Sequence, residues 1–145
     1  MSTDPRTLGW LNRALTHELS AVQQFLAQSV LVRLWGDDAL AEHLKHEATE
    51  ELVHAERLME RLILNGVAPA AHGLPVARLG RNAHELLLAN REIEVGAIHL
   101  YQDALTHAQR VKDAETATLM HSILEEEKQH LVHLDEMIAK RMSHG

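Results

Sequence analysis

Residues 44–58 of this chain read LKHEATEELVHAERL. Leu44 and Leu58 lie on one side of a helix, and Glu51 and His54 fall on that same side between them. A carboxylate buried alone in an apolar core is strongly destabilising, so it is normally protonated, paired or bound to a metal. An acid in the middle of an apolar seam therefore predicts a partner for that acid inside the protein.

The same interruption occurs in every helical stretch of the chain. Apolar spacings of three and four residues predict helices over about 5–35, 38–65, 82–110 and 114–142. Each helix carries an apolar seam, and each seam contains an acid near its middle. The interrupting residues are Glu18, Glu51 with His54, Glu94, and Glu127 with His130.

The spacing of these acids indicates one common site. The number of residues from Glu18 to Glu51 equals the number from Glu94 to Glu127. The second pair therefore repeats the first at a fixed separation in the sequence, the number of residues from Glu18 to Glu94. We call this separation the hairpin offset. The midpoint of the first pair falls at the turn after the first helix, and that of the second pair at the turn after the third. Residues equidistant from the turn of an antiparallel hairpin lie side by side. Each hairpin therefore places a lone Glu level with a Glu-x-x-His.

The connections predict how the hairpins join. Residues 35–38 and 111–113 form short turns, which make the flanking helices antiparallel neighbours. The connection from Gly66 to Arg81 contains Pro69, Gly73 and Pro75 and cannot continue a helix. Its length suits a crossover along the bundle. The sequence therefore predicts an all-α, ferritin-like four-helix bundle, two antiparallel hairpins joined by a long crossover, as a single domain over 1–145.

Four carboxylates and two imidazoles predict a site for two divalent metal ions. Two carboxylates can bridge the metals, and each metal then has one terminal Glu and one His. The four negative charges balance two divalent cations. Oxygen ligands with one nitrogen per metal suit iron or manganese better than copper or structural zinc.

Composition excludes several other classes of protein. The 145 residues include no Cys, so disulfides, Cys-ligated zinc, iron–sulfur clusters and thiol nucleophiles are excluded. The formal net charge of −7 argues against a nucleic-acid partner. No stretch is long and apolar enough to span a membrane, and no basic start with an apolar run indicates a signal peptide, so we expect a cytoplasmic protein.

Over nearly its whole length the chain resembles bacterioferritin. The resemblance is carried by Leu11-Asn12, His17-Glu18-Leu19, Trp35-Gly36, His46-Glu47, Glu51-x-x-His54-Ala55-Glu56-Arg57, Gly73-Leu74-Pro75, Leu79-Gly80, Glu94-Val95-Gly96-Ala97 and Glu125-Glu126-Glu127-x-x-His130. It implies a ferroxidase centre with two iron ions per chain, held by Glu18, Glu51, His54, Glu94, Glu127 and His130. The implied reaction is oxidation of Fe(II) by dioxygen or hydrogen peroxide, followed by iron storage in an oligomer built from dimers.

Three positions depart from the family pattern. Leu52 stands where the family has the Met that holds a haem between two subunits, so we expect no haem in a homo-oligomer; a hetero-assembly with a Met-bearing, haem-binding subunit stays open. Phe25 stands where a Tyr commonly lies near the metals, which removes a one-electron donor. The chain ends at Gly145, without the family's short fifth helix, so an assembly smaller than the family's shell is an alternative.

The remaining histidines are weighed separately. His46 and Glu50 are one turn apart, and in some bacterioferritins a His and an acid here bind an extra iron; the simpler interpretation is a solvated polar face. The other His residues lack a symmetric pattern, and most of them are expected at the surface or at interfaces.

Two alternatives to a ferroxidase remain. The same ligand set serves di-iron or di-manganese peroxidases and catalases. A bundle of this kind could also be a non-catalytic, metal-binding partner subunit of a ferritin assembly.

Overall fold

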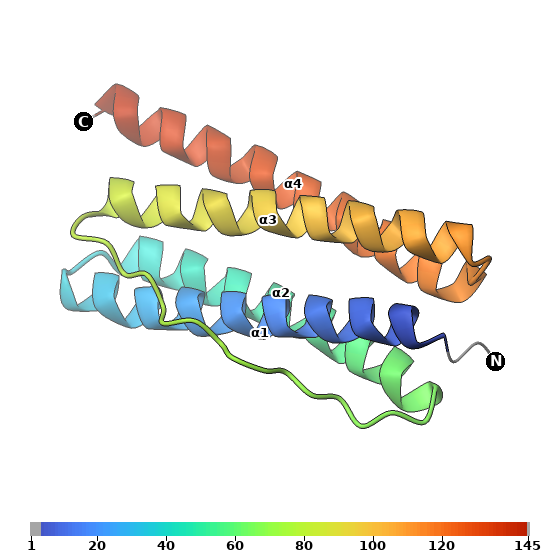
Figure 1. Ribbon diagram of the computed structural model, residues 1–145. Helices are drawn as coiled ribbons and strands as arrows, with labels where there is room; N and C mark the ends of the chain where they lie inside the picture. The colour runs from blue at the N-terminus through green and yellow to red at the C-terminus, as the bar shows by residue number, and fades with distance from the viewer. Residues whose placement is uncertain (1–3, 145) are drawn as a thin grey trace.

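The computed structural model describes residues 4–144, which form four long helices (Figure 1). These are α1 (Pro5–Leu34), α2 (Asp38–Leu64), α3 (Ala83–Arg110) and α4 (Ala114–His144). The expected all-α fold is confirmed, and the predicted helix limits agree to within two residues. None of the helices in the described residues is long and apolar enough to cross a membrane.

Each helix starts at a side chain that caps its free backbone N–H groups. Asp4, Asp37, Asn82 and Asp113 each accept a hydrogen bond from a backbone nitrogen two or three residues later, at 2.8–3.1 Å. Such caps satisfy donors that have no partner within the helix. They explain why the helices begin where they do.

The two hairpins have equivalent turns. Residues 35–37 join α1 to α2, and residues 111–113 join α3 to α4. In both turns the backbone passes through a left-handed residue, Gly36 with φ 90° and Lys112 with φ 60°. Asp37 N donates to Val32 O and Asp113 N donates to Ala108 O, both at 2.9 Å. The equivalent positions of the two turns are related by the same hairpin offset as the two groups of acids.

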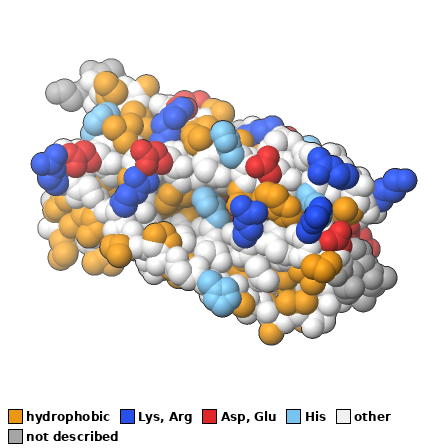
Figure 2. Space-filling view, in the orientation of Figure 1, with side chains coloured by type: hydrophobic (Ala, Val, Ile, Leu, Met, Phe, Trp, Pro, Cys, Tyr) orange, Lys and Arg blue, Asp and Glu red, His pale blue; other side chains and the backbone are white. Residues whose placement is uncertain are grey.

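The connection between α2 and α3 is a strap along α1. Figure 1 shows it running the length of the bundle, so that α2 and α3 point the same way. It is held by side chains of α1, among them Gln23, which donates to Pro75 O at 2.9 Å, and Gln28, which donates to Arg78 O at 2.8 Å. On the face of the molecule in Figure 2, hydrophobic, charged and His side chains are intermingled.

The core consists of two large apolar clusters with a polar band between them. One cluster includes Leu15, Leu58 and Ile123; the other, towards the opposite end, includes Leu44 and Leu87. The helices pair closely as α1 with α2 and α3 with α4, and α1 also packs on α3, whereas α2 and α4 make little direct contact. The candidate metal ligands occupy the band.

Candidate metal centre

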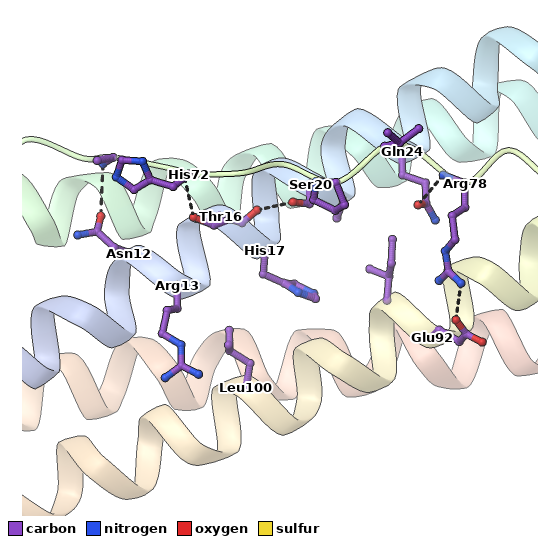
Figure 3. A pocket seen from close by; sticks show the side chains of 15 residues that line it. Asn12, Arg13, Thr16, His17, Ser20, Gln24, His72, Arg78, Glu92 and Leu100 are labelled. Atoms are coloured by element: carbon purple, nitrogen blue, oxygen red, sulfur yellow. Dashed lines mark hydrogen bonds and ion pairs between the residues drawn. The ribbon is translucent and has the colours of Figure 1, made fainter.

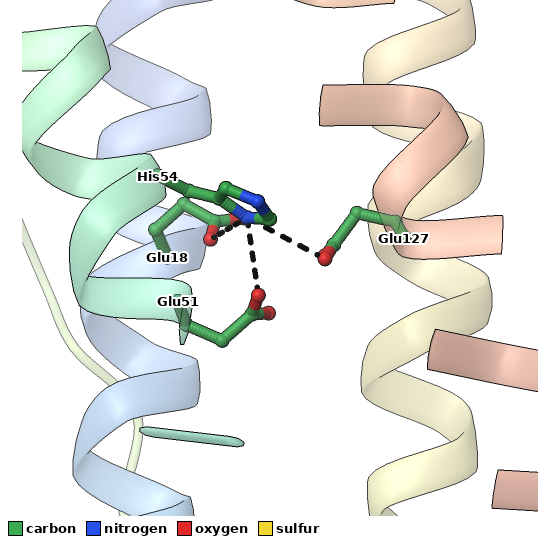
Figure 4. A group of neighbouring side chains, drawn as sticks. All are labelled: Glu18, Glu51, His54 and Glu127. Carbon is green, nitrogen blue, oxygen red and sulfur yellow. Dashed lines mark hydrogen bonds and ion pairs between the residues drawn. The ribbon is translucent and has the colours of Figure 1, made fainter. Parts of the chain in front are cut away.

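The six sequence-predicted side chains meet in the middle of the bundle. Ligand atoms of Glu18, Glu51, His54 and Glu127 all lie within 4.8 Å of one another (Figure 4), and those of Glu51, Glu94, Glu127 and His130 do the same. Two residues, Glu51 and Glu127, belong to both groups. One lone Glu and one His complete each group, which is the arrangement that the equal spacings predict. The assignment of these residues as metal ligands stays a prediction.

All four carboxylates are completely buried. Each has 0% exposure, and both oxygens of Glu51, Glu94 and Glu127 lack a hydrogen-bond partner among the described residues. The Nδ1 atom of His130 also lacks one. Buried polar groups are nearly always satisfied, so a cluster of unpartnered carboxylate oxygens around two imidazole nitrogens fits a bound cation.

Without a cation, burial and mutual repulsion raise the pKa of three of the acids, Glu18, Glu94 and Glu127. Burial and the charge of Glu51 raise the pKa of Glu18 to about 7. Burial, with the charges of Glu51 and Glu47, raises the pKa of Glu94 to about 10, and burial likewise raises the pKa of Glu127. Divalent cations would reverse this balance, because their charge favours the ionised carboxylates.

Both imidazoles reach the buried carboxylates: His130 Nδ1 lies 3.0 Å from Glu127 Oε1, and His54 faces three of the four acids. The Nδ1 of His54 lies 3.2 Å from Glu18 Oε2, 3.1 Å from Glu51 Oε1 and 3.5 Å from Glu127 Oε1. Burial alone would lower the pKa of His54, but the contacts with Glu18 and Glu51 outweigh it and raise the pKa to about 10. One nitrogen cannot bond to three carboxylates at once, so a metal would satisfy this geometry better than a proton.

Both imidazoles point Nδ1 into the cluster and Nε2 outward to a carboxylate. His54 Nε2 lies 3.6 Å from Glu126, whose other oxygen accepts from Arg57 at 2.8 Å. His130 Nε2 lies 3.4 Å from Glu50. Such outer carboxylates orient a ligating His and raise its basicity. Glu50 and Glu126 are again related by the hairpin offset.

The pair considered as an accessory site lies at the surface between α2 and α4. His46 Nε2 is 3.5 Å from Glu50 Oε1, with 71% of the His46 side chain exposed. Together with His43, Glu126, His130 and others, this pair lines a cavity of about 370 Å³. The contact of Glu50 with His130, next to the main cluster, was not predicted from the sequence. The accessory site stays a prediction.

One polar contact to the cluster was also not predicted from the sequence. Tyr101 of α3, the single Tyr of the chain, is fully buried and donates its hydroxyl hydrogen to Glu18 Oε1 at 3.0 Å. Phe25 of α1 is fully buried as well, without a hydroxyl. The absence of Tyr at position 25 therefore does not leave the site without a phenol. The hairpin offset leads from position 25 to position 101, a signal that could have found Tyr101.

A larger cavity of about 840 Å³ lies between α1, α3 and the strap (Figure 3). Its lining includes Thr16, His17 and Gln24 of α1, and Arg78, which pairs with Glu92. His17 is half-buried, its Nε2 has no hydrogen-bond partner among residues 4–144, and burial lowers its pKa. Most of the remaining histidines are expected at the surface or at interfaces, and His17 is an exception. His107 is a second exception, because it is buried and contacts Thr7 Oγ1 at 3.0 Å.

Comparison with known proteins assigns the family. The profile of the ferritin-like domain matches residues 9–142. A bacterioferritin from Mycolicibacterium paratuberculosis is 32% identical over 138 residues, which cover 95% of this chain and 87% of that protein. This chain belongs to the bacterioferritin family. A bacterioferritin from Streptomyces coelicolor is 30% identical over 95% of this chain and 83% of that protein. One from Rhodobacter capsulatus is 27% identical over 96% of this chain and 86% of that protein.

Membership of the bacterioferritin family supports a role in iron storage and iron oxidation. It agrees with the chemistry of the cluster, because carboxylate oxygens with one imidazole nitrogen per ion are ligands that suit iron. The buried carboxylate and His cluster is therefore the candidate iron site of this bacterioferritin-family chain.

Proposed function

We propose that this chain is a ferroxidase that oxidises Fe(II) to Fe(III) at a di-iron centre within the subunit, for iron detoxification and storage. The observation that carries the proposal is the pair of buried ligand groups that share Glu51 and Glu127. A single-metal site would need one group only.

The residues have distinct roles in this proposal. Glu51 and Glu127 would be shared by the two ions, because each belongs to both ligand groups. Glu18 with His54, and Glu94 with His130, supply the terminal ligands. The four ionised carboxylates neutralise two Fe(II) ions, and the apolar clusters on either side exclude bulk water.

The oxidation balances with two electrons. Two Fe(II) ions become two Fe(III) ions and give two electrons to one oxidant molecule. With uptake of two protons, hydrogen peroxide is reduced to two water molecules, or dioxygen is reduced to hydrogen peroxide. The protein holds the two ions next to each other, so that both electrons reach one oxidant molecule.

We also propose that the subunits form a homo-oligomer built from dimers. Exposed apolar side chains support this proposal, since a monomer rarely exposes many of them together. On α1 they include Leu26, Val30 and Leu34, one turn apart in succession, and on α2 they include Leu52 and Val53. Leu52 has no atom that can ligate haem iron, so haem would require a different subunit in a hetero-assembly.

An aerobic Fe(II) titration of the metal-free protein tests the proposed activity. The near-UV absorbance of ferric-oxo species should rise in a fast phase that breaks at two irons per chain. Slower uptake far beyond two irons would demonstrate storage, and a fast phase that stops at two would indicate oxidation without storage. The absence of any fast phase would overturn the ferroxidase proposal.

The same protein samples distinguish the alternatives. Mn(II) loading followed by disproportionation of hydrogen peroxide would favour a di-manganese catalase. Binding of two metal ions with no redox turnover would favour a non-catalytic partner subunit.

A further inference from the structure

The two halves of the metal cluster are not equivalent. The hairpin offset relates Glu18 to Glu94, and it also relates Phe25 to Tyr101. Each aromatic residue follows the lone Glu of its own helix by about two helical turns, along the same face. Since α1 and α3 are antiparallel neighbours, Tyr101 of α3 reaches the lone Glu of α1, Glu18. By the same relation we expect Phe25 near Glu94, and Ile93, the sequence neighbour of Glu94, packs against the cluster that contains Phe25.

Only one of the two aromatic residues can donate a hydrogen bond. Tyr101 donates to Glu18 Oε1 at 3.0 Å, while Glu18 Oε2 faces His54 Nδ1 at 3.2 Å. Both oxygens of Glu94 are buried with no hydrogen-bond partner in the described part of the chain. The carboxylate of Glu18 is therefore held in one orientation, and that of Glu94 is not.

The two histidines of the cluster also differ, because His54 is more firmly held than His130. The His54 side chain is 3% exposed, and its outer partner Glu126 is fixed by Arg57 at 2.8 Å. The His130 side chain is 13% exposed, and its outer partner Glu50 is shared with the exposed His46. The ligands of the Glu18 half are thus the better oriented before any metal binds.

We propose that Tyr101 is a positioning residue that orients Glu18 and makes the Glu18–His54 half the tighter of two unequal metal sites, so that it is filled first. The inference rests on the proposed di-metal function. The hydroxyl of Tyr101 occupies Glu18 Oε1 and leaves Oε2 to bind the ion. Outer partners of metal ligands typically change metal affinity by about 10–100-fold, which is enough to separate two binding steps.

Anaerobic Co(II) titration of the full-length, metal-free protein tests the inference, since Co(II) reports both affinity and ligand geometry through its visible absorption bands. The wild-type chain should bind two Co(II) ions in a tight and a weaker step. Tyr101→Phe should weaken the tight step by about 10–100-fold and alter its absorption bands. Circular dichroism and thermal melting would verify that the variant is folded.

Two half-site variants identify which ion binds first. His54→Ala should remove the tight step, whereas His130→Ala should remove the weaker one. The double variant Phe25→Tyr/Tyr101→Phe keeps the same atoms in the core and moves the hydroxyl to α1. In this background the effects of His54→Ala and His130→Ala should be exchanged.

The outcomes separate this inference from the proposed function. If the wild-type chain binds two Co(II) ions and Tyr101→Phe leaves both steps unchanged, the role of Tyr101 is refuted and the di-metal site stands. If the double variant loads in the same order as the wild-type chain, Tyr101 does not set the order. If the wild-type chain binds fewer than two Co(II) ions, both proposals fail.

Discussion

Replacing Glu94 by Gln should stabilise the metal-free protein while removing one carboxylate from the candidate metal site. The pKa of Glu94 is raised to about 10 from 4.5, so folding at pH 7 forces protonation of a carboxyl that is ionised in the unfolded chain. With each pKa unit worth about 1.4 kcal/mol, this costs about 3 kcal/mol at pH 7 and about 1 kcal/mol at pH 5. The raised pKa thus lowers stability progressively as pH rises above 4.5. Gln keeps the size and polarity of the side chain without this cost.

Thermal and urea unfolding of the metal-free proteins at pH 7 and pH 5 would measure the effect. We expect Glu94→Gln to raise the melting temperature by roughly 10 °C at pH 7, and by much less at pH 5. Glu136→Gln, the same change at a position of α4 outside the buried cluster, should alter stability by less than about 0.5 kcal/mol. Co(II) should raise the melting temperature of the wild-type protein by more than it raises that of the Glu94→Gln variant. The reasoning is refuted if Glu94→Gln raises the melting temperature equally at both pH values, or does not raise it at pH 7.

Three further predictions follow from the site and the turns. Glu51→Ala and His54→Ala should each abolish fast Fe(II) oxidation with circular dichroism unchanged; a wild-type rate in either variant would remove that ligand from the site. Lys112→Gly should raise the free energy of unfolding by about 1 kcal/mol, and Gly36→Ala should lower it by a similar amount, because both positions have positive φ. Urea unfolding that gives either variant the same stability as the wild-type chain would contradict this. Haem titration of the wild-type chain alone should produce no bound-haem absorption, whereas Leu52→Met, which places a thioether where the resemblance implies a haem-ligating Met, should produce it. Haem binding by the wild-type chain would contradict this expectation.

Much of the fold could be predicted because its determinants are local in the sequence. Helical periodicity and the breaks at Gly36 and Gly66 located the elements. The convergence of the candidate ligands also followed from sequence, because residues at equal distances from the turn of an antiparallel hairpin lie at the same level of the bundle. The equal intervals from Glu18 to Glu51 and from Glu94 to Glu127 therefore carried three-dimensional information.

The polar surroundings of the cluster could not be predicted in the same way. Tyr101 occupies a seam position, where an aromatic side chain is ordinarily a packing residue, and its hydrogen bond to Glu18 depends on the contact between α1 and α3. The approach of Glu50 to His130 depends on how α2 faces α4. Periodicity within one helix reports which face is buried, and it does not report which polar atoms meet across helices.

The equivalence of the two turns has a consequence for the origin of such a chain. Each hairpin brings half of the cluster, a lone Glu and a Glu-x-x-His, together with its own N-caps and its own left-handed turn residue. Two identical hairpins related by a two-fold axis would thus assemble the same cluster of six candidate ligands without any strap. One hairpin, present in two copies, is enough to build the whole cluster, and duplication with fusion would join two such units into one gene. Fusion frees the halves to diverge, and the hydroxyl present at Tyr101 and absent at Phe25 is a difference that no symmetric pair could hold.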